Sequence, residues 1–119
     1  MRDYTKLTVW QKSHELVLET YRAVARFPKN ETYGLAAQMR RAASSIPSNI
    51  AEGAGRRTPG DYRKFLDIAS GSASELEYQI RLATALGYLP EETEKELAKA
   101  TGEVKKMLRA LGNRLGANG

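Results

Sequence analysis

Apolar and small residues recur at intervals of three and four along four segments of the chain, and this spacing is the strongest constraint on its fold. It is the spacing of one face of an α-helix, and such a face must be buried against another element. The first two inward faces consist of Val9, Ser13, Leu16, Val17, Thr20, Val24 and Phe27, and of Leu35, Met39, Ala42, Ile46 and Ile50. The last two consist of Tyr62, Phe65, Leu66, Ala69, Ala73, Leu76, Ile80 and Ala83, and of Leu97, Thr101, Val104, Leu108, Leu111 and Leu115.

Helix-breaking residues separate these segments. Pro28 stops the first helix after Phe27, and Gly87 ends the third. Thr58 followed by Pro59 is the clearest start signal, because Thr suits the N-cap and Pro suits the first helical position. Pro47 lies inside the second segment and predicts a bend or a restart of that helix.

Short connections of this kind place consecutive helices antiparallel. We therefore predict an all-α fold, an up-down-up-down antiparallel four-helix bundle with a Pro-kinked second helix. Residues 1–115 form a single domain in this prediction, and residues 116–119 form a frayed C-terminal tail. A charge-rich coiled-coil protein is the alternative, and the Pro and Gly residues between the segments argue against it.

Composition limits the environment and the chemistry of the protein. The 119 residues include no cysteine, which excludes disulfides and thiolate metal sites and favours an intracellular protein. No segment has the apolar run of a signal peptide or of a membrane span, so we expect a bacterial cytoplasmic protein without a membrane partner.

Positive charge is concentrated in the second quarter of the chain. The net charge is +5, and residues 34–64 carry six Arg or Lys against two acidic residues. Arg56 and Arg57 immediately precede the start of the third helix, where exposed N–H groups and two guanidinium groups together suit a phosphate. The candidate nucleic-acid-binding residues are Arg40, Arg41, Arg56, Arg57, Arg63 and Lys64. The alternative is a solvated loop whose arginines only keep the protein soluble.

A row of polar residues follows the edge of the second helix. We expect this polar seam to meet the third helix, where Gly71 and Ser72 are small enough to permit a close approach. Its members are Gln38, Ser45, Ser48, Asn49 and Glu52, with Ser72 and Glu75 as partners. The alternative role is structural, because a satisfied polar seam fixes the register of two helices.

Two helices carry more apolar surface than one inward face requires. The additional residues are Trp10, His14, Leu18 and Tyr21 on the first helix and Ile68, Tyr78, Leu82 and Leu86 on the third. Such surfaces are typical of subunit interfaces, so these residues are the candidate oligomer interface. In the alternative, the aromatic residues flank the core of a monomer and keep their polar tips in water.

Several stretches together resemble a known family. They are LTVWQKSHELV, FPKNETYGLAAQMRRAASSIPSNIAEGAGR, YRKFLDIASGSASELE and ALGYL, and they extend over about residues 5 to 90. This combination resembles the four-helix-bundle family encoded in intervening sequences of bacterial 23S ribosomal RNA genes. The resemblance implies a homopentamer, and it assigns no catalytic residue. The family is also similar in fold to the accessory proteins of diversity-generating retroelements, which engage a reverse transcriptase and its template RNA.

The family motif coincides with the residues already singled out. In this chain it falls on Gln38, Arg40, Arg41, Ser45, Pro47, Ser48, Asn49, Glu52, Gly53, Arg56, Gly71, Ser72 and Glu75. Ala73 departs from the pattern, because the resemblance leads us to expect a leucine at this position.

An enzyme is the least favoured class. His14 is the single histidine, and its apolar and aromatic neighbours indicate packing. The chain has no HExxH motif, phosphate-binding glycine loop or GxSxG motif, so we expect no catalytic residues, no metal and no cofactor. Ser48, Asn49 and Glu52 lie on one helix and cannot by themselves surround a substrate.

Two functions remain. The first is a non-catalytic homo-oligomer, pentameric on the family resemblance, that binds RNA or another nucleic acid through repeated basic loops. The second is a scaffold that recruits a partner protein such as a reverse transcriptase, with RNA contact secondary. A partner interaction that is insensitive to salt would favour the second.

Overall fold

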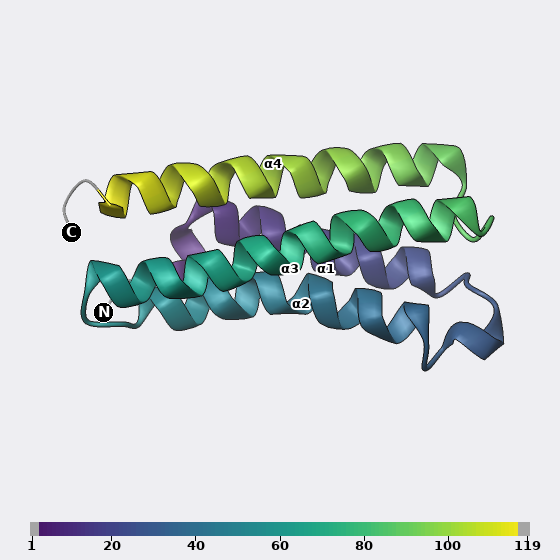
Figure 1. Ribbon diagram of the computed structural model, residues 1–119, viewed down its shortest axis with the longest axis horizontal. Coiled ribbons are helices and arrows are strands. Elements are labelled where there is room, and N and C mark those ends of the chain that lie inside the picture. The colour runs from purple at the N-terminus through teal and green to yellow at the C-terminus, as the bar shows by residue number, and fades with distance from the viewer. Residues whose placement is uncertain (1–2, 117–119) are drawn as a thin grey trace.

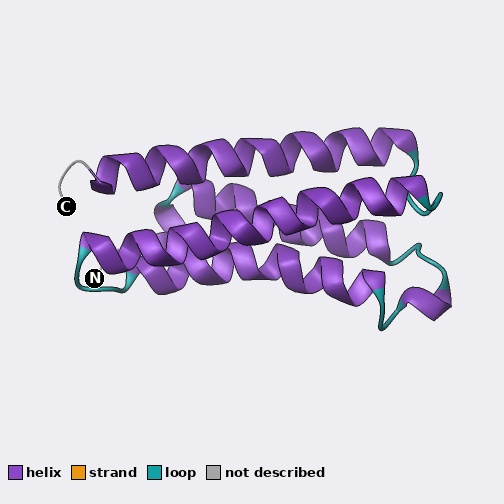
Figure 2. Ribbon diagram, in the orientation of Figure 1, coloured by secondary structure: helices purple, strands orange, loops and turns teal. Residues whose placement is uncertain are grey.

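Four long helices account for most of the chain in a computed structural model that describes residues 3–116. They are α1 (Thr8–Val24), α2 (Leu35–Ala54), α3 (Pro59–Ala85) and α4 (Glu91–Gly116). Two short 3-10 helices, η1 (Tyr4–Lys6) and η2 (Lys29–Glu31), precede α1 and α2. Within the described residues there is no strand, as Figure 2 shows. The predicted all-α fold is confirmed.

The helices run along the longest axis of the molecule and alternate in direction (Figure 1). The Cα atoms extend over 46 × 22 × 20 Å. Each of the pairs α1–α2, α2–α3, α3–α4 and α1–α4 is in contact, which places α1 and α3 on one diagonal of a four-helix bundle. The end that carries the α2–α3 loop also carries the end of α4 (Figure 1).

The predicted inward faces form the core. Met39, Ile46, Leu76 and Ala73 are fully buried, and Val17, Phe65 and Leu115 are the members that lie half-buried at its edge. The buried Ser and Thr hydroxyl groups bond within their own helices, as when Thr101 Oγ1 donates to the Leu97 carbonyl at 2.6 Å. Packing of these periodic faces holds the bundle together, and the sequence has no cysteine that could form a disulfide.

The ends of the helices follow local chemistry. Thr58 Oγ1 accepts a hydrogen bond from the Asp61 amide at 3.1 Å, which confirms Thr58 as the N-cap of α3. Gly87, with φ +80°, ends this helix, and the Tyr88 amide donates to the Ala83 carbonyl at 2.9 Å. The first helix is shorter than predicted, because α1 ends at Val24 and the chain turns before Phe27.

The structure narrows one expectation about α2 and corrects another. The helix α2 continues through Pro47 as one helix, which removes the restart of the two predicted alternatives. The close approach between α2 and α3 occurs at Gly53, where an added Cβ would lie 2.9 Å from the Phe65 Cβ atom. Of the two small residues expected at this contact, Ser72 meets Ser45 with their Oγ atoms 2.8 Å apart, whereas a Cβ at Gly71 would have no neighbouring heavy atom within 4 Å. The steric need for glycine therefore lies at the end of α2.

The C-terminal boundary also differs slightly from the prediction. Gly116 is the last residue of α4, so the expected tail, 116–119, begins with a helical residue. The remainder of that tail lies outside the described residues.

Candidate nucleic-acid interface

The α2–α3 loop presents two arginines with different surroundings. Arg56 Nη2 lies 2.8 Å from Glu52 Oε2, and its guanidinium group lies over the Phe65 ring, 4.6 Å from the ring centroid. Arg57 is exposed and has no hydrogen bond or ion pair within residues 3–116. Of the two, Arg57 is the side chain that is available to a ligand.

The first turns of α3 contribute two further predicted cations. Arg63 Nη1 donates to the Leu115 carbonyl at 3.1 Å, so this arginine caps the last turn of α4. Lys64 Nζ lies 3.7 Å from Asp61 Oδ1, but the Lys64 side chain is 79% exposed. Because this ion pair is so exposed it is weak, and Lys64 can readily exchange Asp61 for a phosphate.

The remaining predicted cations lie elsewhere. Arg40 and Arg41 precede Arg56 by about four turns of α2, which corresponds to roughly 22–24 Å along the helix axis. Arg40 donates to the Thr32 carbonyl at 3.0 Å and lies over the Tyr21 ring. Arg40 and Arg41 therefore do not lie next to the basic loop, because the length of α2 separates them from it.

The structure adds cations that sequence reasoning missed. The second half of α4 carries Lys105, Lys106, Arg109 and Arg114, and its first half carries Glu91, Glu92, Glu94 and Glu96. Because α3 and α4 are antiparallel, the basic half of α4 lies beside the start of α3 (Figure 1). The sequence carries this signal as charge segregated along the last helix, but over residues 65–119 as a whole the seven Arg and Lys nearly cancel the eight Asp and Glu.

The positive charge of the described chain consequently gathers in one half of the bundle. We call residues 3–14, 45–72 and 104–116 the loop half, and residues 15–44 and 73–103 the far half. The loop half contains ten Lys and Arg against four Asp and Glu, whereas the far half contains eight against ten. A surface of this kind attracts polyanions.

The polar seam is real but smaller than predicted. Ser45 Oγ and Ser72 Oγ are 2.8 Å apart, and Asn49 Nδ2 donates to the Ser45 carbonyl at 2.8 Å. A cavity of about 290 Å³ beside them is lined by Gln38, Arg41, Ala42, Ser45, Ser72 and Glu75. Ser48 is exposed, and Glu52 pairs with Arg56 instead. The missed member is Gln79, which is 3% exposed and contacts Glu75 at 3.5 Å.

The predicted interface residues form two separate surfaces. On α1, the Trp10 and His14 rings stack with centroids 5.1 Å apart, and Leu18 and Tyr21 are exposed. On α3, the corresponding residues are Ile68, Tyr78 and Leu86, which are exposed, and Leu82, which packs against the core. Since α1 and α3 are diagonal, these two apolar surfaces do not merge.

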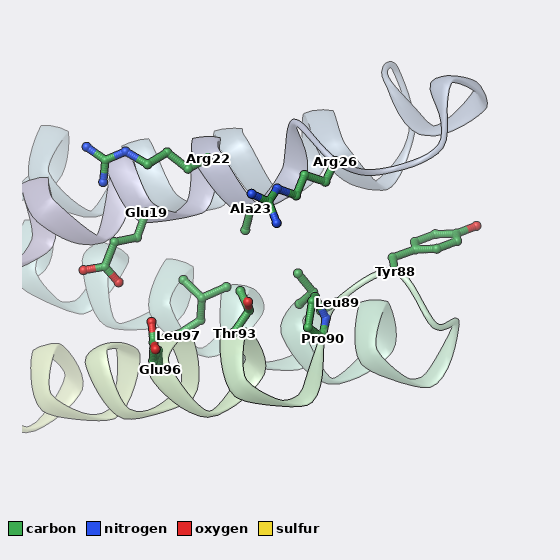
Figure 3. A pocket seen from close by; sticks show the side chains of 10 residues that line it. All are labelled: Glu19, Arg22, Ala23, Arg26, Tyr88, Leu89, Pro90, Thr93, Glu96 and Leu97. Carbon is green, nitrogen blue, oxygen red and sulfur yellow. The ribbon is translucent and has the colours of Figure 1, made fainter.

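A second cavity lies in the far half, between α1 and the start of α4 (Figure 3). Its volume is about 300 Å³, and Glu19 and Glu96 reach into the same gap from the two helices. Burial, with the charges of Glu15 and Glu96, raises the pKa of the Glu19 carboxyl, while Arg22 acts in the opposite direction. Arg22 and Arg26 line the same gap, so its charges balance and it has no positive excess to attract a nucleic acid.

Residues 3–116 contain no group of three or more acidic or histidine side chains that could hold a metal ion. No helix in this part of the chain is long and apolar enough to cross a membrane.

Comparisons with known proteins agree with this architecture. The chain is similar to a solved structure from Bacteroides thetaiotaomicron, a protein of unknown function from the S23 ribosomal protein family. The two are 24% identical with a TM-score of 0.80, over 88% of this chain and 98% of that chain, which supports the shared fold. No curated protein sequence matches the chain. A family model described as 23S rRNA-intervening sequence protein matches residues 5–110, and the chain therefore belongs to that family.

Proposed function

We propose that this protein is a non-catalytic, homo-oligomeric RNA-binding protein whose loop half contacts the RNA. The observation that carries the proposal is the gathering of ten Lys and Arg in that half by the antiparallel helices. Guanidinium and ammonium groups bind phosphates with little regard to base sequence. The family description names an rRNA intervening sequence, which makes structured RNA the first ligand to test.

The two apolar surfaces support self-association. Leu18 and Tyr21 on α1 are 42% and 47% exposed, and Tyr78 on α3 is 62% exposed. Two different surfaces on one subunit pair in a head-to-tail manner, and such contacts close into a ring when the rotation permits. A ring of five, the number that the family resemblance implies, repeats the loop half five times. Repetition raises the avidity of a weak site by roughly a hundredfold or more.

The surroundings of the polar residues argue against catalysis. Asn49 donates to Ser45, and the Glu52 carboxylate pairs with Arg56. Within residues 3–116, neither Asn49 nor Glu52 makes a hydrogen bond to Ser48, and the His14 ring lies flat against Trp10. A hydrolytic mechanism requires a nucleophile and a base within hydrogen-bond reach. The pairs formed by Asn49, Glu52 and His14 instead stabilise helix packing and the C-terminal end of α2.

Fluorescence anisotropy tests this function. The probes are a structured RNA, a single-stranded RNA and a DNA duplex, titrated over a salt series while the oligomer mass is measured in the same buffers. We expect tight binding of RNA that weakens steeply as salt increases. An intact oligomer that binds none of the probes at low salt would overturn the proposal.

A scaffold for a partner enzyme such as a reverse transcriptase is the second candidate. The exposed aromatic residues on α1 and α3 favour it, because aromatic side chains are enriched in protein interfaces. The two functions respond differently to salt. A complex with a protein partner that persists in high salt, without RNA binding, would support the scaffold.

A further inference from the structure

We propose that the groove between α3 and α4 in the loop half, rather than the α2–α3 loop, holds the phosphate backbone of the RNA. This inference rests on the proposed function and specifies where the ligand lies. The groove has a volume of about 320 Å³ and is lined in part by Arg63, Asp67, Ser70, Arg109 and Asn113. We call it the α3–α4 groove.

The first argument is the availability of the cations. Within residues 3–116, the cations of the loop half without a hydrogen bond, ion pair or ring contact are Lys6, Arg57, Lys106 and Arg109. Arg109 lines the groove, and Lys106, three residues earlier on α4, lies on the same exposed side of the helix next to it. In the predicted loop site, the charge of Arg56 is already opposed by the Glu52 carboxylate, and its guanidinium group lies over Phe65.

The second argument is preorganisation. Arg63 lies on the opposite wall from Arg109, and its bond to the Leu115 carbonyl fixes the direction of its guanidinium group. One Nη atom makes this bond, and the group has further N–H donors. An arginine held in this way loses less side-chain entropy when it binds a phosphate. Ser70 and Asn113 add neutral donors to the same groove.

The third argument is the composition of the walls. Gly112 contributes no side chain to the α4 wall, and a Cβ atom there would have no neighbouring heavy atom within 4 Å. A sugar-phosphate strand can therefore approach the helix closely between Arg109 and Asn113. Asp67 works against phosphate binding in this groove, because its exposed carboxylate lines the groove and would repel a phosphate.

The loss-of-charge experiment compares single substitutions that remove one positive charge each. The variant Arg109→Gln tests the groove, and Lys106→Gln tests the exposed side of α4 next to it. Arg57→Gln tests the loop, and Lys99→Gln is the control. Lys99 is an exposed residue of α4 that lies ten residues before Arg109, about 15 Å along the helix. At 0.1 M salt, each lost phosphate contact should weaken binding of a structured RNA roughly eightfold and reduce the salt slope by about one.

The gain-of-affinity experiment uses the acidic residue. Asp67→Asn should tighten RNA binding several-fold, whereas Glu92→Gln changes the net charge equally in the far half and should leave it unchanged. Circular dichroism and oligomer mass confirm that each variant is folded and assembled.

The outcomes separate this inference from the proposed function. If wild-type protein binds no RNA, the proposed function itself fails. If wild type binds but only Arg57→Gln weakens it, the loop is the site and the groove is overturned. Equal effects of Lys99→Gln and Arg109→Gln would also overturn the groove, because overall charge alone would then account for binding.

Discussion

At the scale of single residues, two glycines that look alike in sequence have opposite roles. Gly53 faces Tyr62 and Phe65 across the α2–α3 contact, and an added Cβ would lie 2.9 Å from the Tyr62 Cδ1 atom. Gly71 faces open space. The sequence placed both within a polar, small-residue region but could not distinguish them, because the distance between two helices depends on their packing and not on either segment alone.

Substitution by alanine should therefore change stability in opposite directions. We expect Gly53→Ala to lower the free energy of unfolding by about 1–3 kcal/mol, because overpacking forces the helices apart. Gly71→Ala should raise it by about 0.5–1 kcal/mol, because alanine is the better helix former in an exposed position. Urea denaturation of both variants measures the two values, and a stable Gly53→Ala protein would show that the helices adjust without cost.

At the scale of helices, the sequence predicts most of what the structure contains. The periodic faces, the Thr58 cap and the Gly87 terminator are local properties, so their positions follow from residues a few places apart. The distance between charges on different helices cannot be predicted in this way, because it depends on how the helices pack. Arg40 lies near the start of α2 and Arg56 just beyond its end, so they are far apart, whereas Arg63 and Arg109 line one groove because α3 and α4 run antiparallel.

The contact between α1 and α4 gives a test at this scale. Glu19 faces Glu96 of α4, lies on the same helix as Glu15 and Arg22, and has a raised pKa chiefly through burial. Glu19→Gln should raise the urea midpoint at pH 7, since it removes a partly buried charge. The advantage should shrink as pH falls through the pKa of Glu19 in the folded state, because protonation then neutralises the wild-type carboxyl. A midpoint difference that does not vary with pH would contradict this account.

At the scale of the whole molecule, the proposed ring depends on two different surfaces. Leu18→Glu alters the α1 surface and Tyr78→Glu the α3 surface, and both side chains are exposed enough for the subunit to remain folded. We expect each variant alone to be monomeric. A mixture should form a dimer, because one intact α1 surface can still meet one intact α3 surface. Light scattering distinguishes these states, and a mixture that stays monomeric would exclude head-to-tail pairing.

The unequal charge of the two halves also gives each subunit a permanent electric dipole moment along its 46 Å axis. The peptide dipoles of antiparallel helices largely cancel, so this moment arises from the side chains. A polyanion approaching from solution exerts a torque on such a dipole and turns the loop half toward itself before contact. The orientation of the encounter is thus set at a distance, by the arrangement of the helices rather than by any single arginine.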